Sequence, residues 1–182
     1  MCGIVGVLGF GAFNELDDTY GDSSKYHNYN FVDVEDKILD TLFLVSSLRG
    51  THSSGLFAID GAKPLDPALV RKRVMCPWDF LETNAYKDVK TRYTVNNDSI
   101  IGHTRYATVG NHTLESAHPH QVGNITLVHN GTLTTWVDLV KGDCISDSHA
   151  IATLFSESNG DYAKALEELD GAFALVWHDT NN

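Results

Sequence analysis

The chain opens with Met1-Cys2-Gly3-Ile4-Val5-Gly6, a cysteine followed by the start of an apolar run. The apolar run from Ile4 to Leu8 predicts a buried strand that fixes the start of the chain in the fold. Removal of Met1, which is favoured before a small residue, would leave Cys2 with both a thiol and a free α-amine. Such an amine titrates near pH 8, so it can act as general base for the thiol beside it. The alternative, an ordinary second-position cysteine before a strand, stays open on this stretch alone.

The bulk composition bounds the class of protein. A length of 182 residues with 42% hydrophobic content predicts a single domain over 1–182. A net charge of -11 disfavours nucleic-acid binding, because such a surface repels phosphate. No apolar run reaches membrane-spanning length, and the start lacks the features of a signal peptide. The cysteines form no even set of pairs, which indicates a reducing, cytoplasmic setting; they are Cys2, Cys76 and Cys144.

The hydrophobic pattern predicts strands and helices in an order that suits a layered fold. Apolar runs predict strands at 3–8, 56–59, 68–74, 99–103, 124–129 and 172–177. Helical periodicity predicts helices at 34–48, 78–90, 132–140, 150–156 and 162–169. Two groups of strands with helices between and after them suit a four-layer α/β sandwich, although the pattern alone establishes only an α+β class. The polar, acidic stretch 14–30 is expected to be a surface loop, either a lid or a disordered segment.

A thiol that attacks an amide needs hydrogen-bond donors for the oxygen that gains charge. Asn130 and Gly131, placed by the pattern at the end of a buried strand, offer a side-chain amide and an unhindered backbone N–H. The dipeptide is equally typical of a plain turn.

Two charged residues are candidates for holding an α-amino acid. Arg105 follows the predicted strand 99–103, where a guanidinium could bind a carboxylate through two hydrogen bonds. Asp147, between two small serines, could receive an α-ammonium. A solvated arginine and a helix-capping aspartate are the structural alternatives. With a thiol at the far end, this pair describes a glutamine site.

Seven short motifs occur in order along the chain. They are Cys2-Gly3-Ile4-Val5-Gly6, Arg49-Gly50 with Ser53 and Gly55, Gly102 to Thr108, Ala117-His118-Pro119-His120, His129-Asn130-Gly131, Ser146-Asp147-Ser148 and Leu169-Asp170-Gly171-Ala172. This series resembles the glutaminase domain of class II glutamine amidotransferases, with the glucosamine-6-phosphate synthase branch the most similar. The resemblance covers nearly the whole chain, and each motif alone would be weak.

This resemblance implies an N-terminal nucleophile hydrolase, built as two antiparallel sheets between helical layers. It implies Cys2 as nucleophile and its α-amine as base. The other implied roles are an oxyanion hole of Asn130 and Gly131, substrate contacts from Arg105, Tyr106, Thr108 and Asp147, and support from Arg49. The implied reaction releases ammonia from the side chain of glutamine through a thioester. The ammonia is then expected to reach a synthase partner or a domain missing here.

The chain departs from the family pattern in several places. Tyr106 replaces a tryptophan and keeps an aromatic wall. Val109 replaces a histidine and removes a polar contact, which we expect to alter affinity or gating. The acidic insertion 14–30 has no counterpart, and family domains continue past 172–177 with further strands. The domain is therefore expected to be trimmed or incomplete at its C-terminal end.

The clustered histidines raise the question of a metal site. Histidines 103, 112, 118 and 120 lack the acidic or cysteine company of metal ligands, so we expect no metal and no cofactor. Two other functions remain open beside the glutaminase. One is a binding or regulatory module that recognises glutamine without turnover, and the other is an amidase for another small amide.

Overall fold

A computed structural model describes residues 2–10, 31–92, 98–107, 112–142 and 144–182. The predictions made for Met1, Thr108, Val109 and the insertion 14–30 lie outside the described residues.

One sheet is built around β4 (Asp98–Arg105). Its strand order is β1-β4-β2-β3, and every neighbouring pair is antiparallel. The other strands are β1 (Gly3–Phe10), β2 (Ser53–Ile59) and β3 (Leu69–Arg73). β1 therefore pairs with a strand that comes about a hundred residues later in the chain.

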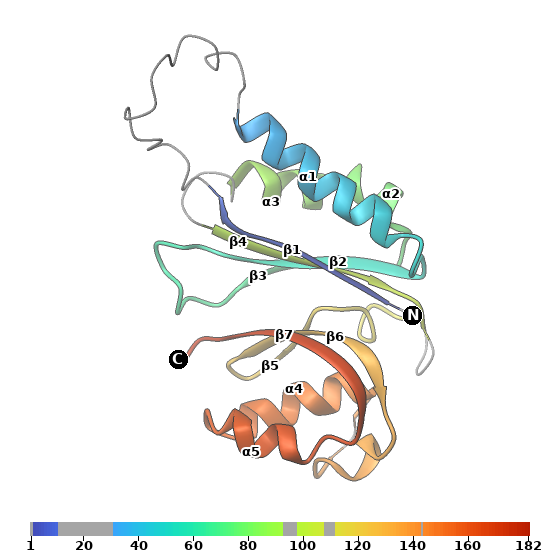
Figure 1. Ribbon diagram of the computed structural model, residues 1–182, viewed down its shortest axis with the longest axis vertical. Helices are drawn as coiled ribbons and strands as arrows, with labels where there is room; N and C mark the ends of the chain where they lie inside the picture. The colour runs from blue at the N-terminus through green and yellow to red at the C-terminus, as the bar shows by residue number, and fades with distance from the viewer. Residues whose placement is uncertain (1, 11–30, 93–97, 108–111, 143) are drawn as a thin grey trace, which may run out of the picture.

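A second antiparallel sheet has the order β5-β6-β7. Its strands are β5 (His120–Val122), β6 (Ile125–Leu133) and β7 (Gly171–Asp179). The two sheets lie face to face, as Figure 1 shows.

Helices cover the outer faces of both sheets (Figure 1). The first sheet carries α1 (Phe31–Ser46), α2 (Pro77–Leu81) and α3 (Asn84–Arg92). The second carries α4 (Asp147–Glu157), α5 (Tyr162–Glu167) and the short 3₁₀ helix η3 (Trp136–Asp138). The layers are thus helix, sheet, sheet, helix, and the predicted four-layer sandwich is confirmed.

Strand alternation explains why the central strands are apolar on both faces. In β4, Ile100 packs toward α1 and α3, whereas Ile101 packs toward the other sheet. In β6, Leu127 packs toward α4, whereas Val128 joins Ile101 between the sheets. Successive side chains point to opposite faces, so a strand covered on both sides needs apolar residues at consecutive positions.

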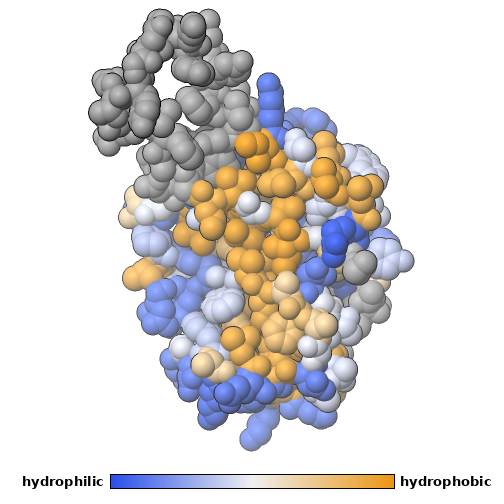
Figure 2. All heavy atoms as spheres, in the orientation of Figure 1, coloured by the Kyte–Doolittle hydropathy of each residue, from blue (hydrophilic) through white to orange (hydrophobic). Residues whose placement is uncertain are grey.

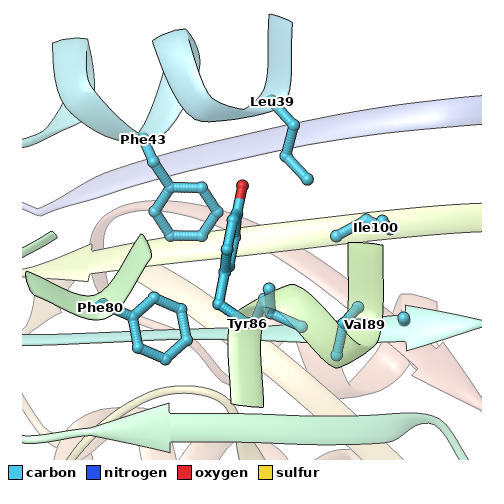
Figure 3. Close-up of a cluster of buried hydrophobic side chains, with 8 residues drawn as sticks. Leu39, Phe43, Phe80, Tyr86, Val89 and Ile100 are labelled. Atoms are coloured by element: carbon cyan, nitrogen blue, oxygen red, sulfur yellow. The ribbon is translucent and has the colours of Figure 1, made fainter. Parts of the chain in front are cut away.

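The core between the first sheet and its helices is rich in aromatic rings (Figure 3). The ring of Phe43 lies 5.9 Å from that of Phe80 and 5.6 Å, edge-on, from that of Tyr86. The phenol of Tyr86 donates to Asp40 Oδ1 at 2.6 Å, which satisfies its polar end. These contacts anchor α1, whose C-terminal end approaches the start of β1.

An apolar band runs down the face of the molecule seen in Figure 2. Apolar side chains of α1, β1 and β7 also line a hollow of about 390 Å³. Its lining includes Leu42, Val45, Ile4, Val5 and Ala174.

Several predicted elements are corrected by the structure. Asn130 and Gly131 do not end their strand in a turn, because pairing with Ala174 and Phe173 carries β6 on to Leu133. The helix predicted at 132–140 is therefore wrong, and only η3 is helical there.

Two further boundaries differ. The helix predicted at 78–90 is split into α2 and α3, because the hydroxyl of Thr83 accepts from Tyr86 N and begins a new helix. The short strand β5, which is not among the strands predicted from apolar runs, pairs with β6.

No helix within the described ranges is long and apolar enough to cross a membrane.

Replacing Leu39 with alanine is expected to lower the free energy of unfolding by about 2–5 kcal/mol, because the side chain is 1% exposed in the aromatic core. The matched control is Leu44→Ala in the same helix, where the side chain is 45% exposed and the expected cost is below about 1 kcal/mol. Urea unfolding of both variants checks this. Equal losses would contradict the packing described for α1.

Candidate active site

The register between β1 and β4 places the start of the chain beside the end of β4. Gly3 pairs with Thr104, so Cys2 lies next to the segment that follows. The backbone N–H of Tyr106 donates to Cys2 Sγ at 3.3 Å, and the thiol is 3.5 Å from the carbonyl oxygen of Tyr106. The sulfur is thus held by backbone groups and is only half-buried.

The loop after α1 supports this arrangement from the other side. Arg49 Nε donates to the backbone carbonyl of Cys2 at 2.7 Å. A side chain at Gly50 would place its Cβ 2.4 Å from the carbonyl carbon of Arg105 and 2.5 Å from the nitrogen of Tyr106. Only glycine allows the loop to lie this close to the backbone that holds the sulfur.

The two charged candidates, Arg105 and Asp147, are both buried, and the residues are 5% and 6% exposed. Arg105 ends β4, and its guanidinium donates to Ser116 Oγ at 3.3 Å. Asp147 opens α4, but Ser146, not Asp147 as predicted, is the N-cap residue. One carboxylate oxygen of Asp147 accepts from Ser148 N at 2.8 Å. Both charges are therefore held in place by short local contacts.

One pocket joins the thiol to both charges. It is lined by Cys2, Arg105, Tyr106, His118, His129, Ser146, Asp147 and Ser148. Its volume of about 20 Å³ holds roughly one water molecule. An amino acid can occupy it only after neighbouring side chains move, and the side chain of Tyr106, which is 48% exposed, forms part of its wall.

Asn130 does not line this pocket. It lines the hollow of about 390 Å³, together with Gly3 and Arg49 among others. Gly3 follows Cys2 in the chain, and Arg49 donates to the carbonyl of Cys2. Gly131 follows in β6, where a Cβ would lie 2.2 Å from the carbonyl oxygen of Ala172.

The electrostatic surroundings of Cys2 are mixed. Burial raises the pKa of its thiol, and the negative charge of Asp147 adds to that rise. The hydrogen bond from the backbone of Tyr106 and the positive charge of Arg105 oppose it. Because the net pKa is raised, the resting thiol is protonated at neutral pH, and its activation requires a base.

Behind the pocket lies a group of buried histidines. Burial lowers the pKa of His103 to about 3 and the pKa of His118 and of His120 well below the usual value. The rings of His103 and His118 are 3.9 Å apart, and those of His118 and His120 are 4.7 Å apart. His118, which lines the pocket with Arg105, therefore adds no positive charge to it. Among the described residues, no group of three or more potential ligands could hold a metal ion.

The structure brings most predicted site residues together. Cys2, Arg105, Tyr106 and Asp147 line one pocket, and Arg49 contacts the carbonyl of Cys2. Asn130 lines a separate hollow with Arg49, and Gly131 is in the lining of neither space. Thr108 lies outside the described residues.

The sequence analysis did not name the pocket residues His118, His129, Ser146 and Ser148 as functional candidates. The available signal was their place in the quoted motifs: His129 precedes Asn130, the two serines flank Asp147, and His118 belongs to the motif 117–120.

The sequence was compared with family models and with curated proteins. No family model matches the chain. Glutamine--fructose-6-phosphate aminotransferase of Streptococcus pneumoniae is 30% identical over 200 aligned positions, covering 100% of this chain and 27% of that protein. The protein of that name from Bradyrhizobium diazoefficiens is 31% identical, covering 97% of this chain and 26% of its own length. The chain thus spans about a quarter of the length of the curated relatives it matches.

A solved structure supports the fold. Glutamine phosphoribosylpyrophosphate amidotransferase from B. subtilis, complexed with ADP and GMP, superposes with a TM-score of 0.58. The superposition covers 78% of this chain and 32% of that chain at 22% identity.

Two antiparallel sheets between helical layers, with a cysteine leading into the first strand, define the fold class of N-terminal nucleophile hydrolases. Within that class, the chain is homologous to the class II glutamine amidotransferases. The resemblance predicted from the motifs is confirmed.

The pKa of Cys2 is expected to respond in opposite directions to the two buried charges. Arg105→Gln should raise it further, because a positive charge that lowers it is lost. Asp147→Asn should lower it, because a negative charge that raises it is lost. The rate of alkylation at Cys2 against pH, followed by peptide mass spectrometry, gives the midpoint. Cys76, whose thiol contacts Asp79 Oδ2 at 2.9 Å, is the internal control and should not change. Shifts of the same sign in both variants would contradict the proposed arrangement of charges.

Proposed function

We propose that this chain is the glutaminase unit of a glutamine amidotransferase, hydrolysing the side-chain amide of glutamine to glutamate and ammonia. The observation that carries the proposal is the single pocket shared by a thiol, a buried guanidinium and a buried carboxylate. A carboxylate and an ammonium on one carbon, with an amide at the far end, is the ligand that this set complements.

In the proposed reaction, the Cys2 thiolate attacks the side-chain carbonyl carbon of glutamine. The α-amine of Cys2, free after removal of Met1, takes the thiol proton and passes it to the departing nitrogen, which leaves as ammonia. The resulting thioester is hydrolysed by water, which restores the thiol and yields glutamate. The raised pKa of the thiol supports the need for such a base.

Substrate contacts follow from the same arrangement. Arg105 binds the α-carboxylate and Asp147 binds the α-ammonium, while Tyr106 forms the wall over the pocket. Asn130 and Gly131 supply the donors for the oxyanion, and Arg49 steadies Cys2 through its carbonyl. Thr108 is proposed to add a contact to the substrate headgroup. The reaction requires no cofactor or metal.

The ammonia is proposed to pass to a synthase partner or to a further domain. The relatives support this, because their names describe aminotransferases and the chain matches only 26–27% of their length. We place the protein in the cytoplasm, since Cys2 and Cys76 form no disulfide in the described part of the chain and a thiol nucleophile requires a reducing setting.

Protein shown by mass spectrometry to lack Met1 should release glutamate and ammonia from glutamine. Cys2→Ala should reduce the rate to background, at least about 10³-fold, because the nucleophile is lost. Cys76→Ala is the matched control and should keep the wild-type rate. Turnover that survives in Cys2→Ala ends the assignment. Glutamine binding without turnover by the processed protein would instead favour the regulatory module.

Arg105→Ala separates glutamine from other amides. The variant should raise KM for glutamine by about tenfold or more, because a charged hydrogen-bond partner of the carboxylate is lost. Hydrolysis of a primary amide without a carboxylate should change by less than about twofold. Equal losses for both substrates would make Arg105 structural and favour an amidase for another small amide.

A further inference from the structure

His129 contacts both the strand that ends in Arg105 and the helix that begins with Asp147. It lies in β6 directly before Asn130 and is 2% exposed. Its backbone carbonyl accepts from His103 Nε2 at 3.0 Å, which ties β6 to β4 at this point. Its ring Nδ1 is 2.9 Å from Ser148 Oγ, at the start of α4. One residue thus contacts a strand of the first sheet and the helix that carries Asp147.

We assign the direction of these hydrogen bonds from Asp147. Its carboxylate can only accept, and the hydroxyl of Ser148 donates to Asp147 Oδ1 at 3.4 Å. With that proton committed, Ser148 Oγ accepts from Nδ1–H of His129; the opposite tautomer, in which Ser148 donates to Nδ1, is the arrangement that the variants below test against. Burial lowers the pKa of His129, so the ring is neutral and its Nε2 is a bare acceptor. Among the described residues, this buried Nε2 has no hydrogen-bond partner.

The same ring lies against the residue proposed to complete the oxyanion hole. Residues two apart in a strand share a face, which brings His129 and Gly131 to the same side of β6. A Cβ at Gly131 would lie 2.7 Å from His129 Nε2. The ring is therefore enclosed by the α-carbon of Gly131 on one side and by Ser148 on the other, with Asp147 Oδ2 4.0 Å from Nδ1.

We propose that His129 is a positioning residue that orients Asp147 through Ser148 toward the α-ammonium of glutamine and seats Gly131 at the oxyanion. The inference rests on the proposed function and adds to it a residue that lines the pocket of Cys2 but acts through Ser148 and Asp147. In this relay, His129 donates to Ser148, and Ser148 donates to Asp147, whose carboxylate is thereby oriented.

Isosteric variants of His129 test this relay. The amide nitrogen of His129→Asn reaches the place of Nδ1–H and keeps the donor to Ser148. The amide of His129→Gln reaches the place of Nε2 and loses that donor, so it is the matched control. We expect His129→Asn to keep KM for glutamine within about threefold of wild type. We expect His129→Gln and Ser148→Ala each to raise KM about tenfold, as expected for a bond to a charged group, with kcat within about threefold for Ser148→Ala.

The double variant His129→Gln/Ser148→Ala provides a second test. If the two residues act in series, its KM should match that of either single variant instead of showing the product of the two effects. Equal KM values for the Asn and Gln variants, or multiplied losses in the double variant, would overturn the relay. Thermal midpoints of all variants identify any that fail to fold, and those are replaced in the comparison by Ser148→Ala alone, for which an unchanged KM overturns it equally.

Binding measurements keep this inference separate from the proposed function. Calorimetric titration of glutamate into Cys2→Ala protein that carries the same substitutions should show the same order. We expect the His129→Asn protein to bind glutamate with a lower Kd than the His129→Gln protein. Absent turnover by the processed wild type together with this order would reject the glutaminase and keep the relay. Wild-type turnover with equal Kd values for the two variants would do the reverse.

Discussion

The antiparallel pairing of β1 with β4 is the constraint on which the site depends. It joins the first residues of the chain to a segment about a hundred residues later, and it does so in a register that leaves Cys2 beside Tyr106. Slipping that register by one residue would turn every side chain of β1 to the opposite face. The apolar side chains on both faces of β4 prevent such a slip, because each face packs against its own core. The hydrophobic cores and the position of the thiol are therefore set together.

Two buried charges of opposite sign lie near the sulfur of Cys2. Arg105 and Asp147 are both buried, and their opposite charges act in opposite senses on the thiol. The histidines behind them are neutral, since burial lowers the pKa of His103 and His118. Arg105 and Asp147 thus present opposite charges to one pocket, which agrees with the zwitterionic ligand proposed for it.

Much of this could be predicted from the sequence, and the failures have physical causes. The layered fold and the strands at 3–8 and 99–103 followed from apolar runs, because those strands are buried on both faces. Asn130-Gly131 misled the local pattern, since its strand continues only through pairing with β7, a partner about forty residues later in the chain. Arg105 and Asp147 do line one pocket, as expected from their charges and from the family motifs in which they occur. His129 and Ser148 were missed as functional candidates, because the role proposed for them depends on their contact with each other in space. Their spacing in the chain does not reveal that contact.

Arg49 links Cys2 to the aromatic core of the first sheet. Its guanidinium donates to the carbonyl of Cys2 from the turn that follows α1, and α1 itself is anchored by the rings of Phe43 and Tyr86. The position of the thiol's own peptide unit is therefore set by the packing of that helix as well as by the pairing of β1 with β4.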